Sequence, residues 1–450
     1  MGKYFGTDGF RGEANVNLTV EHAYKVGRFL GWYYGKQAKG DRCRVVIGKD
    51  TRRSSYMFEY SLAAGLTASG ADTYLLHVTT TPSVSHVIRT EDFDCGIMIS
   101  ASHNPYYDNG IKVMNGNGEK LEESVIEEIE KYLDGEMEEI PLAKRENIGR
   151  TQDFAAGRNR YIGYLISIAT RSFKGKKVGL DCSNGSASSV AKSVFDALGA
   201  DTYVINDQPD GVNINMGCGS THIEGLQLYV REHHLDVGFA FDGDADRCLL
   251  VDEQGGVIDG DKVLAVCGSD MKRRGKLSGG TIVATVMSNL GLHEFCRENG
   301  VGLVCTSVGD RNVLERMLEK GYAIGGEQSG HTIFTDYATT GDGQLTALQF
   351  LDVLARSGKK ASELASVCPQ YPQVLLNVAV SHERGVKDAI MASDALSAAI
   401  AEEEGKLSGE GRVLVRPSGT EALIRVMVEA KTEQIALLAA ENLVNVIKML

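Results

Sequence analysis

The sequence is poor in proline, in paired cysteines and in long apolar runs, and each shortage excludes a class of protein. Seven prolines beside 52 glycines suit short turns rather than disordered linkers. The nine cysteines form no C-x-x-C pair, which predicts reduced thiols in a cytoplasmic protein instead of a disulfide framework or zinc site. No run approaches the roughly 18 apolar residues of a membrane span. Residues 1–10 lack the apolar core of a signal peptide, so we expect no membrane partner.

Positive charge is also scarce, because the formal net charge is −13 and the sequence pI is near 5.4. Binding to nucleic acid requires a basic face, so we expect no nucleic-acid partner. A small anionic ligand stays compatible if a few Arg and Lys side chains form a local positive pocket. The chain also lacks a G-x-x-x-x-G-K-[ST] loop, a strand-linked G-x-G-x-x-G and a G-x-S-x-G elbow. Kinases, dehydrogenases and α/β hydrolases therefore lack their usual signatures here.

The length and the alternation of elements predict several α/β domains. A chain of 450 residues favours roughly three or four domains. Short apolar runs alternate with helix-length segments such as 58–69 and 188–198, which is typical of βαβ units with helices on both sheet faces. The expected strands are 44–48, 73–78, 96–100, 178–181, 237–241, 282–286 and 302–306.

We predict three similar α/β domains with mixed, largely parallel sheets, and a smaller C-terminal α+β domain, around a central cleft. The expected domains are residues 1–154, 155–255, 256–368 and 369–450. In the last domain, helices over 387–403 and 432–449 are expected to flank a strand–turn–strand unit at 412–430. Ile424, Val426 and Val428 fall on one face of its second strand, and Arg425 falls on the other.

The first candidate functional segment is the apolar run that starts at Cys95 and ends in a polar turn at Ser100–Pro105. Ser102 follows the carboxyl end of the expected strand, the edge at which open α/β sheets bind ligands. Residues 103–105 predict one turn, and Asn109-Gly110 predicts another. A helix N-cap or a simple loop stays an alternative for this serine.

The second candidate is the acidic run Asp242-Gly243-Asp244-Ala245-Asp246-Arg247, which follows a buried strand. Three alternating carboxylates repel one another unless a cation compensates them, and oxygen ligands suit Mg²⁺. A calcium EF-hand is rejected because Arg247 occupies the sixth position, where that loop needs glycine. A solvated acidic turn stays the simpler alternative.

Three further loops carry polar groups suited to ligands. The segment 325–331 offers a carboxylate, an amide, a hydroxyl and an imidazole to a polyhydroxylated ligand. The segment 416–421 offers one guanidinium and two hydroxyls for a phosphate, although alone it would also suit an ordinary hairpin turn. The glycine-rich segment 5–12 could bring Arg11 to an anion, or could be a plain loop.

These motifs, in this order and one per expected domain, resemble the α-D-phosphohexomutase superfamily over essentially the whole chain. Segments 3–12 and 326–331 are most similar to the bacterial members that act on glucosamine phosphates. Members that prefer glucose or mannose phosphates more often have Met in place of Gln328. The resemblance implies interconversion of glucosamine 6-phosphate and glucosamine 1-phosphate through phosphoserine and glucosamine 1,6-bisphosphate. That reaction serves the synthesis of UDP-N-acetylglucosamine and cell-wall precursors.

The resemblance also implies residue roles. Ser102 matches the serine that carries the transferable phosphoryl group and ligates one Mg²⁺ per chain with Asp242, Asp244 and Asp246. Matches around the reacting phosphoryl group are Arg11, His103 and Lys112, and the acid/base candidates are Lys112 and His331. Matches to sugar contacts are Gly309, Asp310, Glu327 and Ser329, and Thr7 and Arg247 are also expected to bind substrate. Matches to the site for the non-reacting phosphate are Arg416, Ser418, Gly419, Thr420 and Arg425.

Two departures and several alternatives accompany this interpretation. Ala245 replaces a frequent glycine, and Ala422 replaces the proline usual after the phosphate loop, which could loosen that loop. A sugar 1,6-bisphosphate is the expected activator, with a separate kinase as the alternative, and a homodimer is the oligomeric hypothesis. The rival functions are a glucose or mannose phosphate mutase, a catalytically silent sugar-phosphate-binding protein and a metal-dependent phosphatase.

Overall fold

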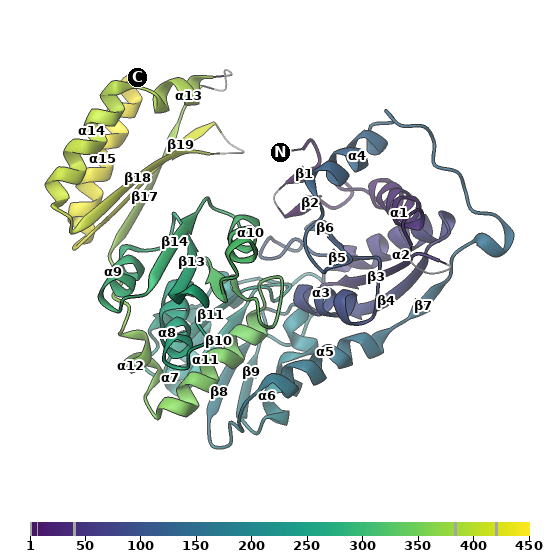
Figure 1. Cartoon of the computed structure of the whole chain (residues 1–450), viewed down its shortest axis with the longest axis horizontal. Coiled ribbons are helices and arrows are strands. Elements are labelled where there is room, and N and C mark those ends of the chain that lie inside the picture. The colour runs from purple at the N-terminus through teal and green to yellow at the C-terminus, as the bar shows by residue number, and fades with distance from the viewer. Residues whose placement is uncertain (1, 7, 39–41, 382–384, 419–421) are drawn as a thin grey trace. The chain divides into compact units, whose positions relative to one another are not determined.

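The computed structural model describes residues 2–6, 8–38, 42–381, 385–418 and 422–450, and the chain forms four β-sheets with associated helices (Figure 1). Contacts divide it into two compact units. The first consists of Met1–Met287 and Gly302–Val367 and holds three sheets, whereas the second consists of Ser288–Val301 and Cys368–Leu450 and holds the fourth. The predicted fold class, with three mixed α/β sheets and a smaller C-terminal α+β part, is confirmed.

The first sheet has seven strands in the order β1-β2-β6-β5-β3-β4-β7. Its centre is parallel, and β1, β2 and β6 add antiparallel pairs at one edge. The strands are β1 Phe5–Gly6, β2 Gly9–Glu13, β3 Arg44–Lys49, β4 Asp72–Val78, β5 Cys95–Ile99, β6 Asp108–Asn115 and β7 Thr151–Asp153. The helices that follow these strands are α1 Val20–Gly35, α2 Arg53–Ala68, α3 Thr81–Thr90 and α4 Glu123–Leu133, with a short 3₁₀ helix at Arg145–Asn147.

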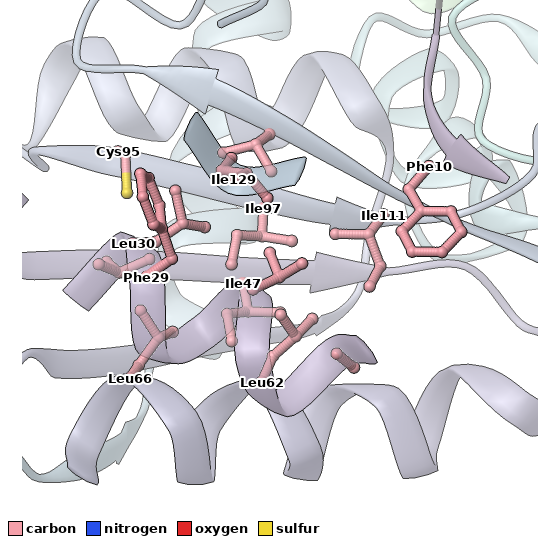
Figure 2. Packing of buried hydrophobic residues seen from close by; sticks show 14 of the residues in the cluster. Phe10, Phe29, Leu30, Ile47, Leu62, Leu66, Cys95, Ile97, Ile111 and Ile129 are labelled. Atoms are coloured by element: carbon pink, nitrogen blue, oxygen red, sulfur yellow. The ribbon is translucent and has the colours of Figure 1, made fainter. Parts of the chain in front are cut away.

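The core of this part lies on both faces of the sheet. Figure 2 shows one cluster, in which Phe29 of α1 and Leu62 of α2 lie close to Ile47 of β3 and Ile97 of β5. A second cluster places α3 on the strands through Val84 and neighbouring apolar side chains. Full burial of each such side chain contributes roughly 1.5–3 kcal/mol. Coverage of both faces explains why the central strands are continuously apolar.

The second and third sheets repeat the same plan. The five-stranded sheet has the order β12-β11-β10-β8-β9, and the four-stranded sheet has the order β14-β13-β15-β16. Their strands are β8 Lys177–Asp181, β9 Asp201–Ile205, β10 Val237–Phe241, β11 Cys248–Asp252, β12 Val257–Ile258, β13 Thr281–Thr285, β14 Gly302–Thr306, β15 Ile324–Gly326 and β16 Thr332–Phe334. Their helices are α5 Ala155–Ile168, α6 Ala191–Ala197, α7 Glu224–Glu232, α8 Gly260–Arg273, α10 Asp310–Lys320, α11 Gly343–Ser357 and α12 Ala361–Ala365, with 3₁₀ turns at Ser186–Ser189, Gly219–Thr221 and Ser278–Gly280.

One connection recurs in all three sheets and positions the candidate site. In each sheet, a strand that is parallel to one neighbour turns back as the antiparallel partner of the next strand. These pairs are β5–β6, β10–β11 and β15–β16. The loops inside the three pairs carry Ser102, the aspartates 242–246 and the segment 327–331. The three motifs therefore occupy the same topological position in three successive sheets.

The second unit is built around the antiparallel sheet β17-β19-β18. Its elements are α9 Leu290–Glu298, β17 Gln373–Ala379, α13 Val386–Met391, α14 Asp394–Leu407, β18 Gly411–Pro417, β19 Leu423–Ala430 and α15 Glu433–Met449. Ile424, Val426 and Val428 are fully buried in its core, as the alternation predicts. Strand β17 carried no prediction.

The seven predicted strands are confirmed to within one residue at each end, but three local predictions are wrong. Asn109-Gly110 is not a turn, because both residues pair inside β6 with β2 and the Asn109 amide donates to Ser54 and Ser55. The helix expected over 387–403 is interrupted, because Ser393 caps a new helix by accepting from the Ala395 N–H. The segment 188–198 begins as a 3₁₀ turn, in which Ser188 and Ser189 donate to nearby carbonyls.

Among the described residues, no helix is both long and apolar enough to cross a bilayer.

Candidate active site

Ser102 lies in the β5–β6 loop and is almost fully buried, with 1% of its surface exposed. Its backbone is left-handed, with φ of 51°, a conformation that non-glycine residues adopt only when their surroundings enforce it. The hydroxyl Oγ donates to Oδ2 of Asp242 at 2.5 Å, and Nδ1 of His103 lies 3.4 Å from the same oxygen. The structure therefore brings the serine and the acidic run together across 140 positions of sequence.

The acidic run fits a hard divalent cation. One carboxylate oxygen from each of Asp242, Asp244 and Asp246 lies within 4.8 Å of the others, and all three residues are buried. Oδ1 of Asp244 and Oδ1 of Asp246 are buried without a hydrogen-bond partner among the described residues. Burial, together with Asp246 and Asp244, raises the pKa of Asp242 well above its ordinary range. An all-oxygen donor set with surplus negative charge suits Mg²⁺.

Lys112 compensates part of this charge. Its Nζ lies 2.7 Å from Oδ2 of Asp244, 3.4 Å from Oδ2 of Asp246 and 2.9 Å from Oδ2 of Asp8. Burial alone would lower the pKa of Lys112, but Asp244 and Asp8 raise it well above its ordinary value. In this arrangement Lys112 is an ammonium ion that bridges the first two sheets.

Asp8 and Lys120 extend the bridge to the third sheet, and the sequence interpretation assigned neither. Nζ of Lys120 lies 2.9 Å from Oδ1 of Asp8 and 2.7 Å from Oδ2 of Asp310, while Arg11 pairs with Asp8 from another side. Despite burial, Lys112, Lys120 and Arg11 hold the pKa of Asp8 well below its ordinary range. The only sequence feature that could have indicated Asp8 is its place in the glycine-rich segment 5–12. No sequence feature indicated Lys120.

The loop after β15 brings a second group of predicted residues close to this chain of charges. Nε2 of His331 lies 3.5 Å from Oδ2 of Asp310, and neither ring nitrogen of His331 has a hydrogen-bond partner among the described residues. The Gly309 N–H donates to Oε1 of Glu327 at 3.1 Å, and Ser329 is exposed. Unpaired buried polar atoms at one place are the expected state of a site that awaits a polar ligand.

Gln328 has a different environment from its neighbours. Its Nε2 donates to Oδ2 of Asp259, the N-cap residue of α8, at 3.2 Å. The Gln328 amide is thus tied to a helix terminus.

His103 and Arg247 are two further predicted residues near the serine and the acidic run. Burial first, and then the cations Arg247 and Arg11, lower the pKa of His103 to about 4, so its ring is neutral at neutral pH. The Arg247 N–H donates to Oδ1 of Asp242 at 3.2 Å, and its Nε lies 4.0 Å from Oδ1 of Asp246. A neutral imidazole beside a hydroxyl is a group that can accept or return a proton.

Two cavities adjoin these residues within the first unit. Their volumes are about 420 Å³ and about 210 Å³, and both are lined by Asp8, Lys112, Lys120 and Asp310. The smaller cavity also borders Asp246 and His331. Sites for small molecules commonly span roughly 300–1,000 Å³, so the space suits a monosaccharide phosphate.

The remaining predicted residues lie in the second unit or outside the described residues. Arg416 of β18 is the direct cross-strand partner of Arg425 in β19. Burial and then Arg425 lower the pKa of Arg416, and like charges placed opposite each other favour a bound anion. The Ser418 carbonyl accepts from Lys387 at 2.7 Å. Thr7, Gly419 and Thr420 lie outside the described residues.

Family models match nearly the whole chain. Their descriptions are phosphoglucomutase/phosphomannomutase alpha/beta/alpha domain I over residues 2–139, domain II over 159–256, domain III over 259–371 and the C-terminal domain over 375–446.

Similar curated proteins include the phosphoglucosamine mutase of Lachnospira eligens, which is 64% identical over 449 residues covering 100% of this chain and 99% of that protein. The phosphoglucosamine mutase of Lachnoclostridium phytofermentans is 63% identical and covers 100% and 98%. Among solved structures, a phosphoglucomutase/phosphomannomutase family protein of Burkholderia thailandensis has a TM-score of 0.81 at 22% identity, with 100% and 98% of the two chains covered. The Aspergillus fumigatus N-acetylphosphoglucosamine mutase, in complex with GlcNAc-6P and magnesium, has a TM-score of 0.71 at 19% identity and covers 99% and 95%.

Proposed function

Because this chain belongs to the phosphoglucomutase/phosphomannomutase family, we propose that it is an isomerase that interconverts glucosamine 6-phosphate and glucosamine 1-phosphate. The preference for glucosamine phosphates is supported by relatives named phosphoglucosamine mutase, at up to 64% identity over the full chain. Its product would enter amino-sugar metabolism, on the route to UDP-N-acetylglucosamine and cell-wall precursors. The reaction would take place in the cytoplasm.

One observation carries the chemistry of this proposal, the hydrogen bond of 2.5 Å from Oγ of Ser102 to Asp242. A binding protein needs no buried hydroxyl beside three carboxylates, whereas a phosphoryl carrier does. In the proposed reaction, phosphorylated Ser102 gives its phosphoryl group to the free hydroxyl of the sugar phosphate. The resulting 1,6-bisphosphate turns around and returns its other phosphoryl group to Ser102, so atoms balance over the cycle.

The residues around Ser102 have proposed roles that their contacts support. Asp242, Asp244, Asp246 and the serine oxygen hold one Mg²⁺ per chain, which when bound neutralises charge on the transferring group. Lys112 is within reach of the acidic run and of Asp8, and it holds a proton next to the reacting oxygen.

A second set of residues binds and orients the sugar phosphate. His103 and Arg11 surround the reacting phosphoryl group together with Lys112, and Arg247 binds the substrate. Asp310, Glu327 and Ser329 contact the sugar, with His331 as the second acid/base group. Arg416 and Arg425 carry the positive charge for the non-reacting phosphate, and Thr7, Gly309, Ser418, Gly419 and Thr420 complete the substrate contacts.

We also propose four functional domains, at residues 1–154, 155–255, 256–368 and 369–450, one for each motif. The four sheets follow these bounds except at one strand, because β12 (Val257–Ile258) pairs with β11 across the boundary at 255. A sugar 1,6-bisphosphate serves as activator by phosphorylating Ser102, and the working oligomer is a homodimer.

The experiment is to measure the isomerisation rate with glucosamine, glucose and mannose 6-phosphates after activation with glucose 1,6-bisphosphate. We expect the highest kcat/KM with glucosamine 6-phosphate. Equal or better use of mannose or glucose phosphate would overturn the substrate preference, and steady release of inorganic phosphate would instead identify a phosphatase.

The matched variant is Ser102→Ala, which removes one oxygen from a packed loop. We expect it to lose isomerisation while its thermal unfolding midpoint stays near that of the wild type. Mass spectrometry of freshly purified wild-type protein should find the phosphoryl group on Ser102. A Ser102→Ala protein with near-normal turnover would rule out the phosphoserine route, and a wild type without turnover would leave a binding protein.

A further inference from the structure

Arg52 is a fully buried arginine that the proposed reaction does not use. Its side chain and that of its partner Asp50 are both 0% exposed. It stands directly before α2, three residues after β3 ends. Burial of a guanidinium is costly unless its N–H groups are all paired, so the partners of Arg52 show what it is for.

The guanidinium of Arg52 donates to three carbonyl oxygens of the loop that carries Ser102. Nη2 donates to the carbonyls of Ser102 and Asn104, at 2.9 Å each, and Nη1 donates to the carbonyl of Pro105. One rigid side chain therefore ties Ser102 to the adjacent residues Asn104 and Pro105, where one turn ends and the next begins.

Asp50 orients this guanidinium and connects it to the other side of Ser102. Oδ2 of Asp50 accepts from Nε of Arg52 at 2.7 Å and from the Ser100 hydroxyl at 2.8 Å. The Ser100 hydroxyl in turn accepts from the Ser102 N–H at 2.9 Å. Both the N–H and the carbonyl of Ser102 are thus held by a single buried network.

This network acts on a residue whose backbone needs support. The left-handed φ of Ser102, 51°, costs of order 1–3 kcal/mol and persists only where neighbours enforce it. Since χ1 of the serine starts from that backbone, its Oγ can point at Asp242 only while the loop keeps this shape.

We propose that Arg52 is a positioning residue, which holds the loop so that Ser102 presents its hydroxyl to the acidic run. This inference rests on the proposed role of Ser102 as phosphoryl carrier. A lysine cannot replace the arginine, because an ammonium is a point donor that cannot reach three carbonyls arranged around a planar fork. Arg52 therefore affects the transfer step and leaves substrate affinity alone.

The test is Arg52→Lys, which keeps the charge opposite Asp50. We expect kcat for glucosamine 6-phosphate to fall about 100-fold, the typical cost of roughly 1 Å of misplacement, while KM changes less than about threefold. The rate of Ser102 phosphorylation by glucose 1,6-bisphosphate, followed by mass spectrometry, should fall by the same factor. A loss of stability alone would not produce this division between kcat and KM.

The matched control is Arg28→Lys, because Arg28 is also buried, at 3% exposed, and donates to a backbone carbonyl, that of Ile140. We expect its unfolding midpoint to fall while kcat below that midpoint stays within about twofold of wild type. If Arg52→Lys does not fold, Ser100→Ala removes the partner of the Ser102 N–H with a smaller change. It should lower kcat about 10-fold, because the acceptor of the Ser102 N–H is lost while the hydrogen bonds from Arg52 to the loop carbonyls remain.

The outcomes separate this inference from the proposed function. Wild-type protein that turns over normally, beside Arg52→Lys or Ser100→Ala with unchanged kcat, overturns the role of Arg52 alone. A raised KM with unchanged kcat, or an equal loss of kcat in Arg28→Lys, overturns it as well. Wild-type protein without isomerase activity overturns the proposed function instead.

Discussion

Gly243 is the place where the loop of the three aspartates touches the loop that carries Ser102, and substituting it should move these two loops apart. It lies between Asp242 and Asp244, and a Cβ built there would be 2.5 Å from the carbonyl oxygen of Ser102. Ordinary contact begins at 3.4 Å, so Gly243→Ala must move the two loops apart by roughly 1 Å. The carbonyl cannot yield easily, because Arg52 and Asn215 both donate to it.

The magnitude of the effect follows from this distance. Overpacking a well-packed site costs typically about 1–3 kcal/mol of stability. A displacement of roughly 1 Å between reacting groups lowers the rate about 100-fold. Gly243 adjoins Asp242, which accepts the hydrogen bond from Ser102, so the displacement acts on that contact. We therefore expect Gly243→Ala to unfold at a lower temperature and to lose about two orders of magnitude in kcat.

Two other glycines provide controls for steady-state isomerisation and thermal unfolding assays. A Cβ on Gly27 of α1 would collide with the Leu62 carbonyl of α2 even more closely, and neither residue lines the two cavities of the candidate site. Gly27→Ala should lose similar stability and keep its kcat. Gly163 of α5 has nothing within 4 Å of a built Cβ, so Gly163→Ala should keep kcat and gain up to about 1 kcal/mol. A wild-type kcat in Gly243→Ala would refute this prediction, and so would a loss of kcat in Gly27→Ala equal to that in Gly243→Ala.

Three further predictions concern charge. Removing divalent ions with a chelator should abolish isomerisation, and Mg²⁺ at 100 times its Kd should raise the unfolding free energy by about 2.7 kcal/mol; calorimetry that finds no Mg²⁺ binding would contradict the assigned ligands. Lys120→Met leaves Asp8 and Asp310 without their shared ammonium, and because these side chains are partly exposed we expect a loss of about 1 kcal/mol in denaturant unfolding. An unchanged midpoint would show that the bridge is not stabilising. Burial raises the pKa of Asp342 to about 6, so the folded protein binds a proton on this carboxyl more tightly than the unfolded chain does. The protonated carboxyl therefore stabilises the folded state at pH 4, and this contribution is lost as pH rises through 6. The stability of Asp342→Asn relative to wild type should therefore grow by up to about 3 kcal/mol between pH 4 and pH 7, and parallel pH profiles would refute this.

The strands were predictable because burial on two faces leaves a continuous apolar run. The run at 237–241 coincides with β10, and the run at 302–306 coincides with β14. Local dipeptide rules failed where tertiary contacts were stronger: Asn109 finds two buried serine partners inside a strand, so the Asn-Gly pair forms no turn. The helix over 387–403 failed for the opposite reason, because a single serine cap was enough to start a new helix.

Side chains that connect distant segments could not be read from the sequence. Ser102 and Asp242 each follow the carboxyl end of a strand, but the two strands belong to different sheets, so only the family resemblance indicated that these residues meet. The roles of these residues stay predictions. Lys120 contacts Asp310, 190 positions away in the sequence, and also contacts Asp8. No local pattern marks this lysine. Arg52 follows a strand as any exposed arginine might, and only the loop carbonyls around it show why it is buried.

The assignment of α9 to the second compact unit has a consequence for dissection of the chain. The peptide crosses between the units at 287–288, 301–302 and 367–368. The Leu290 N–H and the Asn289 amide both donate to Glu429, a fully buried residue of β19. A protease that cuts only at 367–368 would therefore yield two fragments that stay associated through this carboxylate, and a fragment expressed from residue 368 onward would expose a charge that the intact chain conceals.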